Sequence, residues 1–322
     1  MHLYRIPRLY CPYATWADQA LTTKIAVHTQ AWLRKFELLH NEEQFDFYEK
    51  HHFAALIVSS YPNASEKALE TWCDLNALLF LVDDHMDETT TFNSPEEMLL
   101  LEGKFMEVLH KGTYNGTQKT LCAFNDFWQR AREISTVEWQ QTFVQNIRDM
   151  FAGSLWQLKH ILHAKKPALR DYQLLRQYLG AAHLATDCLT MMGDVNLPEE
   201  ITSSVLYARL TGHCRNAICY SNDLFSLSKE MSRSTAGAAF NLVSVLSNAW
   251  SLSMEAAISE AVRVHNEEVH QFELLSAVLL SRYPAYNKAI RKYLEGLQYL
   301  MTGNIHWSTK LTARYPHIYE GN

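Results

Sequence analysis

Four carboxylates stand together at the end of an apolar segment of the chain. Asp83, Asp84, Asp87 and Glu88 follow directly after the run LLFLV. On a helix, Asp83 and Asp87 lie on one face, ~6 Å apart along the axis, where their charges repel each other and the negative helix end. The run before them is apolar on every side, which indicates a buried helix end. The alternatives are a solvated acidic loop or a carboxylate cluster that binds a hard cation such as Mg²⁺.

A second polar segment, NDLFSLSKE, also follows an apolar stretch. Asn222, Ser226 and Glu230 recur every four residues, so a helix would hold their oxygens within an arc of about 80° and ~12 Å along the axis. On its own this spacing is more typical of an ordinary polar stripe. Lys229, next to Glu230, offers an ammonium group that could bind phosphate. The two segments together predict a site for metal ions and an anionic ligand.

Helices should position both segments. Gly and Pro number only 11 and 8 in 322 residues, and 48% of the chain is hydrophobic, which favours long helices around a sizeable core. Three cap motifs place Asn63, Ser94 and Ser135 three residues before a glutamate, each ahead of a long segment with helical periodicity. We therefore expect one all-α domain over residues 1–322, with roughly ten or more helices.

The composition of the chain limits the classes of partner that we expect for the protein. The formal charge of −6 is spread without basic runs, so we expect no nucleic-acid partner. No apolar run approaches 18 residues and the N-terminus lacks a leader pattern, so we expect a cytoplasmic protein without a membrane span. The six scattered cysteines indicate reduced, buried thiols.

With these motifs the chain resembles the class I terpene synthases, or terpene cyclases, of the bacterial type. The motifs DDHMDE and NDLFSLSKE are similar to the family's two metal-binding motifs. The family also has a diphosphate-sensing arginine 46 positions before the triad asparagine, and Arg176 stands there. Four residues later, where the family has a small effector residue at a helix break, stands Gly180. The family's C-terminal Arg-Tyr pair corresponds to Arg314 and Tyr315.

The resemblance implies a helical bundle with a central apolar cavity that binds three Mg²⁺ ions, or Mn²⁺ as a substitute, and a prenyl diphosphate. It implies the following metal ligands: Asp83, Asp84, Asp87, Asn222, Ser226 and Glu230. It implies that the diphosphate is bound by Arg176, Lys229, Arg314 and Tyr315, with Gly180 at the helix break. Phe80 and Trp307 are candidates for the aromatic wall, although core packing is the alternative for each. Two departures from the family pattern are Val82 and Leu179.

The implied activity is ionisation of farnesyl diphosphate and cyclisation to a sesquiterpene, with geranylgeranyl diphosphate as the alternative substrate. A chain-elongating prenyltransferase would show two aspartate-rich motifs, and this chain has one. Four Glu-x-x-His spacings leave open a di-iron carboxylate oxidase, and a non-catalytic helical scaffold is the remaining alternative. A homodimer is also left open.

Overall fold

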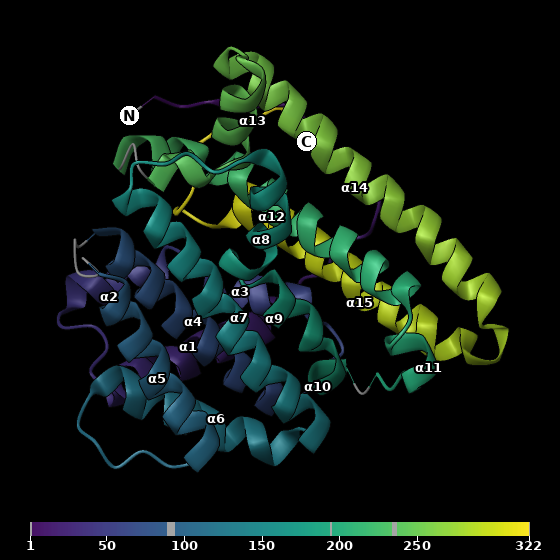
Figure 1. The fold of residues 1–322 in the computed structure, drawn as a ribbon. Helices are drawn as coiled ribbons and strands as arrows, with labels where there is room; N and C mark the ends of the chain where they lie inside the picture. Colours follow the sequence, from purple (N-terminus) through teal and green to yellow (C-terminus); the bar gives the residue numbers. More distant parts are fainter. Residues whose placement is uncertain (1, 89–93, 194, 234–236, 322) are drawn as a thin grey trace.

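The low content of glycine and proline produces an almost entirely helical molecule in the computed structural model (Figure 1). The structure describes residues 2–88, 94–193, 195–233 and 237–321, and the side chains of 83–88 lie outside this description. The prediction of an all-α fold is confirmed, since the described strands comprise only two residues each.

The helices are α1 (Gln19–Lys35), α2 (Glu42–Glu49), α3 (Phe53–Ser60), α4 (Glu66–Glu88), α5 (Pro95–Lys111), α6 (Lys119–Ile134), α7 (Val137–Leu162), α8 (Leu169–Leu179), α9 (Ala182–Asp187), α10 (Leu189–Gly193), α11 (Glu199–Thr202), α12 (Val205–Arg233), α13 (Leu242–Trp250), α14 (Met254–Arg282) and α15 (Asn287–His306). The shorter elements are β1 (Arg5–Ile6), η1 (Gly237–Phe240), η2 (Pro284–Tyr286), the π-helical turn η3 (Trp307–Leu311) and β2 (Ile318–Tyr319).

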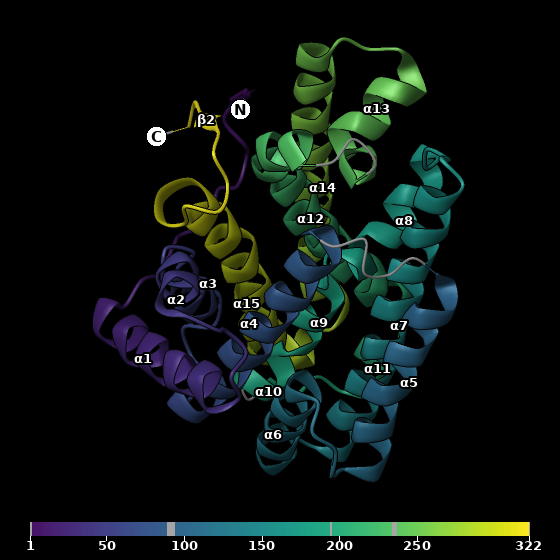
Figure 2. The same ribbon diagram turned by 90° about the vertical axis from the view of Figure 1, so that its left-hand side faces the viewer.

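Helix α12 forms the centre of the half of the molecule that contains the second motif. It packs against α8, α9, α14 and α15 (Figures 1 and 2). Buried residues recur along it at helical spacing, including Leu210, Cys214, Ala217 and Leu224. Since Cys214 and Ala217 are small, neighbouring helices can approach closely there. The helix that bears the second motif is thus held firmly on several sides.

An aromatic cluster joins α5, α6 and α7 in the other half. The rings of Phe105 and Phe124 lie 4.6 Å apart, and Phe143 stacks on Trp128 with ring centroids 5.4 Å apart. These side chains are 2% exposed or less. Each buried ring contributes ~2 kcal/mol through the hydrophobic effect, so the cluster stabilises the wall of helices opposite α14.

The helix caps follow the sequence motifs with two corrections. Ser94 caps α5 as expected, and its hydroxyl accepts a hydrogen bond from the backbone of Glu97. Ser65, rather than Asn63, accepts the capping bond at the start of α4. Thr136, rather than Ser135, caps α7. In both corrected cases two residues able to cap lie within two positions, and the sequence motif alone did not decide between them.

The two ends of the described chain are paired. β1 and β2 form a parallel pair in which Arg5 lies opposite Ile318 and Ile6 opposite Tyr319. The backbone of Tyr4 also donates a hydrogen bond to the hydroxyl of Ser228, on α12. Figure 2 shows both termini and β2 at the same corner of the molecule. The N-terminal segment therefore anchors the C-terminal tail near the second motif.

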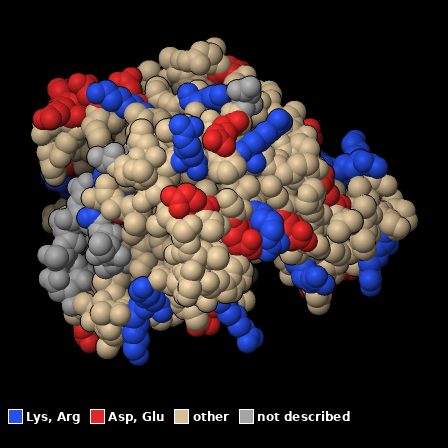
Figure 3. Space-filling model, turned by 90° about the horizontal axis from the view of Figure 1, so that it is seen from above, with Lys and Arg blue, Asp and Glu red and all other residues tan. Residues whose placement is uncertain are grey.

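The surface and the cysteines agree with the composition. Lysine and arginine side chains are interspersed with acidic ones on the face seen in Figure 3. The cysteines are free thiols; Cys73, Cys188, Cys214 and Cys219 are buried, whereas Cys11 and Cys122 are only partly so. Among the described helices, none combines the length and the apolar character needed to cross a membrane.

Candidate active site

The second motif lies on α12, as the spacing predicted, and its side chains are connected. Ser226 donates a hydrogen bond to Oε1 of Glu230 over 2.6 Å. Asn241, which caps α13, donates to the other oxygen of Glu230 over 2.9 Å and to the backbone carbonyl of Asp223 over 2.7 Å. Burial, together with the nearby charge of Asp223, raises the pKa of Glu230 to about 7. In the absence of a cation, burial favours the protonated form of this carboxyl group. A cation bound next to Glu230 would stabilise the charged form instead.

Arg176 reaches the same helix from the last turn of α8. Its Nε donates to Oδ1 of Asp223 over 2.9 Å, and its Nη2 donates to Oδ1 of Asn222 over 3.1 Å. The second oxygen of Asp223 accepts from the hydroxyl of Tyr172 and from the backbone of Leu242. Arg176 and Asp223 are both buried. The guanidinium is therefore fixed against the polar motif by a carboxylate that is itself held from α8 and α13.

Asp223 and Asn241 are functional candidates that the sequence analysis did not assign. The motif letters contain Asp223 directly after Asn222, and that adjacency was the available signal. On a helix, neighbouring positions point about 100° apart, so Asp223 points away from the face that Asn222 shares with Ser226 and Glu230, and the guanidinium of Arg176 bonds to both Asp223 and Asn222. Nothing in the sequence near Asn241 pointed to the hydrogen bond with Glu230, because that contact depends on how α13 packs.

Gly180 lies at a helix break, as the sequence predicted. α8 ends at Leu179, and Ala181, with φ of 53°, precedes α9. A Cβ atom on Gly180 would clash with Nη1 of Arg176 and lie 3.1 Å from Sγ of Cys219. A side chain at this position would displace the guanidinium, so the close approach, and not a left-handed conformation, favours glycine here; the left-handed residue is Ala181.

The C-terminal tail brings a second arginine and a tyrosine to the motif. Asn222 donates a hydrogen bond from its amide to the hydroxyl of Tyr315 over 3.0 Å. The guanidinium of Arg314 lies over the ring of Phe80, 4.8 Å from its centre. Both tail residues are buried. The tail therefore connects the end of α4 to α12.

Phe80 and Trp307 lie in one aromatic group with Phe53. The rings of Phe53 and Phe80 stack at 4.3 Å, and Trp307 lies 6.1 Å from Phe80. Trp307 is 1% exposed, and its indole donates to the carbonyl of His51 over 2.7 Å. The rings of Tyr315 and Trp307 form a T-shaped pair with centroids 5.5 Å apart. In this structure Trp307 is packed in the core, where it supports Tyr315 and Phe80.

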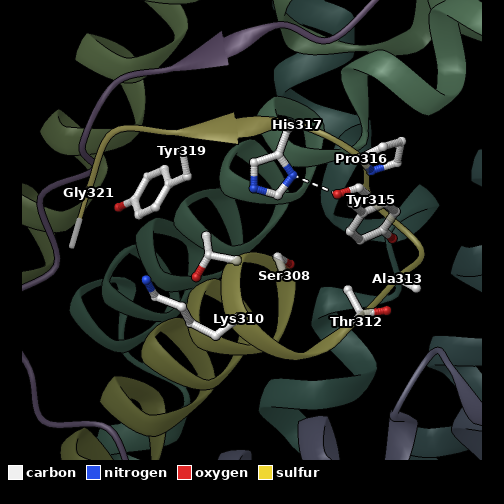
Figure 4. Close-up of a pocket in the computed structure, with 10 residues that line it drawn as sticks. Ser308, Lys310, Thr312, Ala313, Tyr315, Pro316, His317, Tyr319 and Gly321 are labelled. Atoms are coloured by element: carbon white, nitrogen blue, oxygen red, sulfur yellow. Dashed lines mark hydrogen bonds between the residues drawn. The ribbon is translucent and has the colours of Figure 1, made fainter. Parts of the chain in front are cut away.

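A polar hollow of about 290 Å³ lies between η3 and the tail (Figure 4). Its lining includes Ser308, Lys310, Tyr319 and the predicted site residue Tyr315, whose carbonyl accepts a hydrogen bond from Nδ1 of His317 over 2.7 Å. Neither Phe80 nor a member of the second motif lines it. This hollow is therefore distinct from the apolar cavity that the sequence predicted.

For the first motif, the structure describes only the course of the backbone. α4 continues to Glu88, so Asp83, Asp84 and Asp87 are helical as predicted, but their side chains lie outside the described part of the structure. Figures 1 and 2 place the C-terminal ends of α4 and α12 at the same end of the molecule. Phe80, one turn before Asp83, contacts the tail residue Arg314. The last described turns of α4 thus approach the site.

Lys229, the proposed phosphate-binding lysine, lies beside Glu230 on α12 and is 8% exposed.

The second motif fits hard divalent cations, because the side chains of Asn222, Ser226 and Glu230 offer only oxygen to a metal. The oxygens of Ser226 and Glu230 already converge to 2.6 Å. The residues that are described therefore match the donor set expected for Mg²⁺ or Mn²⁺.

The Glu-x-x-His spacings do not converge on a common iron site. Glu37 and Glu107 form salt bridges with lysines, and His270 packs on the ring of Tyr10. Glu37 follows α1, Glu107 lies on α5 and His270 lies on α14, and α5 and α14 lie on opposite sides of the molecule in Figure 1. The di-iron alternative is therefore not supported by the positions of these side chains.

The chain matches one protein-family model and is similar to known proteins over most of its length. The model of "Terpene synthase family 2, C-terminal metal binding" matches residues 74–271. The chain is 26% identical to germacrene A synthase of Nostoc punctiforme over 94% of this chain and 92% of that protein. It is 27% identical to the (+)-T-muurolol synthase, "(2E,6E)-farnesyl diphosphate cyclizing", of Roseiflexus castenholzii, over 95% and 90% of the two chains.

The fold is also that of solved terpene synthases. The structure matches 2-methylisoborneol synthase from Streptomyces coelicolor, solved with Mg²⁺ and 2-fluoroneryl diphosphate, with a TM-score of 0.83 and 20% identity. The match covers 96% of this chain and 97% of that one. At this identity the likeness establishes the fold and leaves the choice of substrate to other arguments.

Proposed function

The chain belongs to terpene synthase family 2, and we propose that it cyclises farnesyl diphosphate to a sesquiterpene with release of diphosphate. The recognition of a class I terpene synthase from its motifs is thereby confirmed, and the iron oxidase and scaffold alternatives are wrong. By its name, the (+)-T-muurolol synthase reported above cyclises farnesyl diphosphate, which favours a C15 substrate. We propose that residues 1–322 act as one domain.

The observation that carries the proposal is the hydrogen-bonded chain from Arg176 through Asn222 to Tyr315. It links α8, the second motif and the tail, which are three of the four places where the sequence predicted ligands for diphosphate and metal; the fourth is the first motif on α4. We propose that Arg176, Lys229 and Arg314 neutralise the diphosphate while it leaves. Arg176 is suited to bind two phosphate oxygens at once because its guanidinium is planar.

We propose that Asn222, Ser226 and Glu230 bind divalent metal from α12, and that Asp83, Asp84 and Asp87 bind it from α4. Three Mg²⁺ ions are expected, with Mn²⁺ as a substitute. When bound, the metal supplies Lewis-acid stabilisation of the negative charge on the diphosphate. The reaction needs no protein nucleophile, because the allylic C–O bond ionises and the electron pair leaves with the diphosphate.

The carbocation that remains must be kept from water and folded for ring closure. We propose that Phe80 belongs to the aromatic wall around this cation and that Trp307 packs against Phe80 and Tyr315. The tail residues Arg314 and Tyr315 would exclude water, because both are buried against the site.

The proposed substrate is tested by incubating the purified protein and Mg²⁺ with geranyl, farnesyl and geranylgeranyl diphosphates in parallel. Gas chromatography and mass spectrometry then identify the hydrocarbon products. We expect cyclic C15 products from farnesyl diphosphate as the main outcome. Turnover of the C20 substrate alone would contradict the substrate assignment and leave the terpene synthase activity in place.

A further inference from the structure

We propose that Arg215, on α12, is a positioning residue that fixes the helix break between α8 and α9 and thereby influences which products form. Its guanidinium contacts residues on both sides of the break. Nη1 donates to the side chain of Gln177, before the break, over 3.2 Å. Nε donates to the hydroxyl of Thr186 and Nη2 to the carboxylate of Asp187, after the break, each over 2.7 Å. One side chain thus holds the end of α8 and the end of α9 together.

The partners of Arg215 are themselves held in place. The second oxygen of Asp187 accepts from the amide of Asn146, on α7, over 2.8 Å. His183, which is 1% exposed, lies with one ring nitrogen 3.0 Å from the carbonyl of Gln177 and the other 2.9 Å from that of Asn146. The break is therefore clamped between α7 and α12, and Arg215 supplies the α12 side of this clamp.

The backbone at the break between α8 and α9 is strained and closely packed, so contacts from neighbouring helices are needed to hold it in place. Ala181 adopts a left-handed conformation, which costs of order 1 kcal/mol for a residue other than glycine. Gly180 lies directly against the guanidinium of Arg176. A shift of the break would therefore move Arg176 relative to the second motif.

Arg215 lies eight positions before Asp223 on the same helix, about 12 Å along the axis. Asp223 fixes the guanidinium of Arg176, and Arg215 bonds to the side chains of Gln177, Thr186 and Asp187, on either side of the break that follows it. α12 thus holds the α8–α9 segment at two points. The inference rests on the roles proposed above for Arg176 and Gly180, since the clamp matters for the reaction only if that segment contacts the substrate.

The test compares Arg215→Gln with Arg130→Gln. Arg130 is a matched control, because its side chain is 22% exposed against 18% for Arg215 and also bridges two acceptors, on Asp74 and Asp126. Both variants lose a partly buried ion pair and should melt at a lower temperature. Hydrogen exchange in the metal-free protein should speed up about tenfold over residues 180–187 in Arg215→Gln only.

With farnesyl diphosphate and Mg²⁺, we expect kcat of Arg215→Gln to fall at least tenfold and the share of minor products to at least double, since small misplacements of catalytic groups are costly. Arg130→Gln should keep the wild-type product distribution. Arg215→Lys should recover only part of the loss, because an ammonium cannot reproduce three directed bonds.

A wild-type product distribution in Arg215→Gln, with kcat within about twofold of wild type, would overturn the inference even if exchange increases, since small displacements at a catalytic site cost far more than that. The proposed function would stand in that case, because wild type remains active. A wild-type protein that yields no product from any prenyl diphosphate would overturn the proposed function and this inference together.

Discussion

Nη2 of Arg176 donates a hydrogen bond to Oδ1 of Asn222 over 3.1 Å, although the two residues are 46 positions apart in the chain. The amide of the same Asn222 donates to Tyr315. An amide oxygen has two lone pairs, so Oδ1 of Asn222 can accept from Arg176 and still bind a cation. This asparagine therefore couples the proposed diphosphate sensor, the proposed metal site and the tail.

Replacement of Arg176 by lysine should remove most of the activity although the charge is kept. Lysine lacks the planar fork that contacts Asp223 and Asn222 together, so the cation should lose its fixed direction. We expect kcat/KM to fall about 100-fold or more, as is typical when a preorganised donor is lost. Steady-state release of diphosphate measures this.

The matched control is Arg34→Lys, because Arg34 binds the two oxygens of Glu42 in the same forked way at an exposed position. Its activity should stay at the wild-type level. Equal turnover in Arg176→Lys and wild type would remove Arg176 from the diphosphate site.

Replacement of Gly180 by alanine should displace the guanidinium of Arg176, because the new methyl group would clash with Nη1. We expect a folded protein whose kcat falls about tenfold or more, since the shift affects positioning. Circular dichroism and product release together measure the two effects.

Gly212→Ala is the control for this substitution. Gly212 lies on α12, and a Cβ atom there would meet nothing within 4 Å. This change should leave activity unaltered and raise the unfolding free energy by up to ~1 kcal/mol, since alanine favours helix. If Gly180→Ala matched Gly212→Ala in activity, the close approach to Arg176 would have no role in the reaction.

The parts of the site that follow helix periodicity could be predicted from the sequence. Asn222, Ser226 and Glu230 share α12 because their spacing of four fixes their common face. The bond from Arg176 to Asp223 and the bond from Asn222 to Tyr315 could not be predicted in this way, because they depend on how distant helices pack. The motif resemblance supplied Arg176 and Tyr315, and only the structure supplied their partners.

The pairing of β1 and β2 was also missed. A strand of two residues has no measurable alternation of apolar and polar side chains, so the pattern on which strand prediction depends is absent. Helix ends were predicted less well than helix interiors, since both Asn63 and Ser65 could cap α4.

The tail should act as a cover over the site. Tyr315→Phe removes the acceptor for the amide of Asn222, so we expect kcat to fall about tenfold with the fold intact. Deletion of residues 310–322 should abolish turnover or increase products in which water has captured the cation. Mass spectrometry of the products, with melting curves as the check on folding, distinguishes these results. An unchanged product profile after the deletion would show that the tail does not cover the site.

Acid should destabilise the fold partly through His265. Burial lowers the pKa of His265 to about 4, while in an unfolded chain it is about 6.5. Below pH 6.5 the unfolded state binds a proton that the folded state excludes, so the contribution to stability is present above that pH and is lost as the pH falls toward 4. One such group changes the unfolding free energy by up to about 1.4 kcal/mol per pH unit.

Urea unfolding of wild type and His265→Gln between pH 7 and pH 4.5 measures this contribution. The unfolding free energy of wild type should fall more steeply than that of the variant. His163→Gln, at an exposed position, should follow wild type. Parallel curves for wild type and His265→Gln would exclude His265 as the source of the slope.

The central claim is that oxygen ligands on α12 bind the metal on which diphosphate release depends. Release of diphosphate from farnesyl diphosphate, measured across a Mg²⁺ titration for wild type and Glu230→Gln, tests it most directly. We expect EDTA to stop wild-type release and Mg²⁺ to restore it, and we expect Glu230→Gln to be at least about 100-fold less active at any Mg²⁺ concentration, because a ligand charge is lost. Wild-type release that persists in EDTA, or a wild-type Mg²⁺ response in Glu230→Gln, would contradict the account.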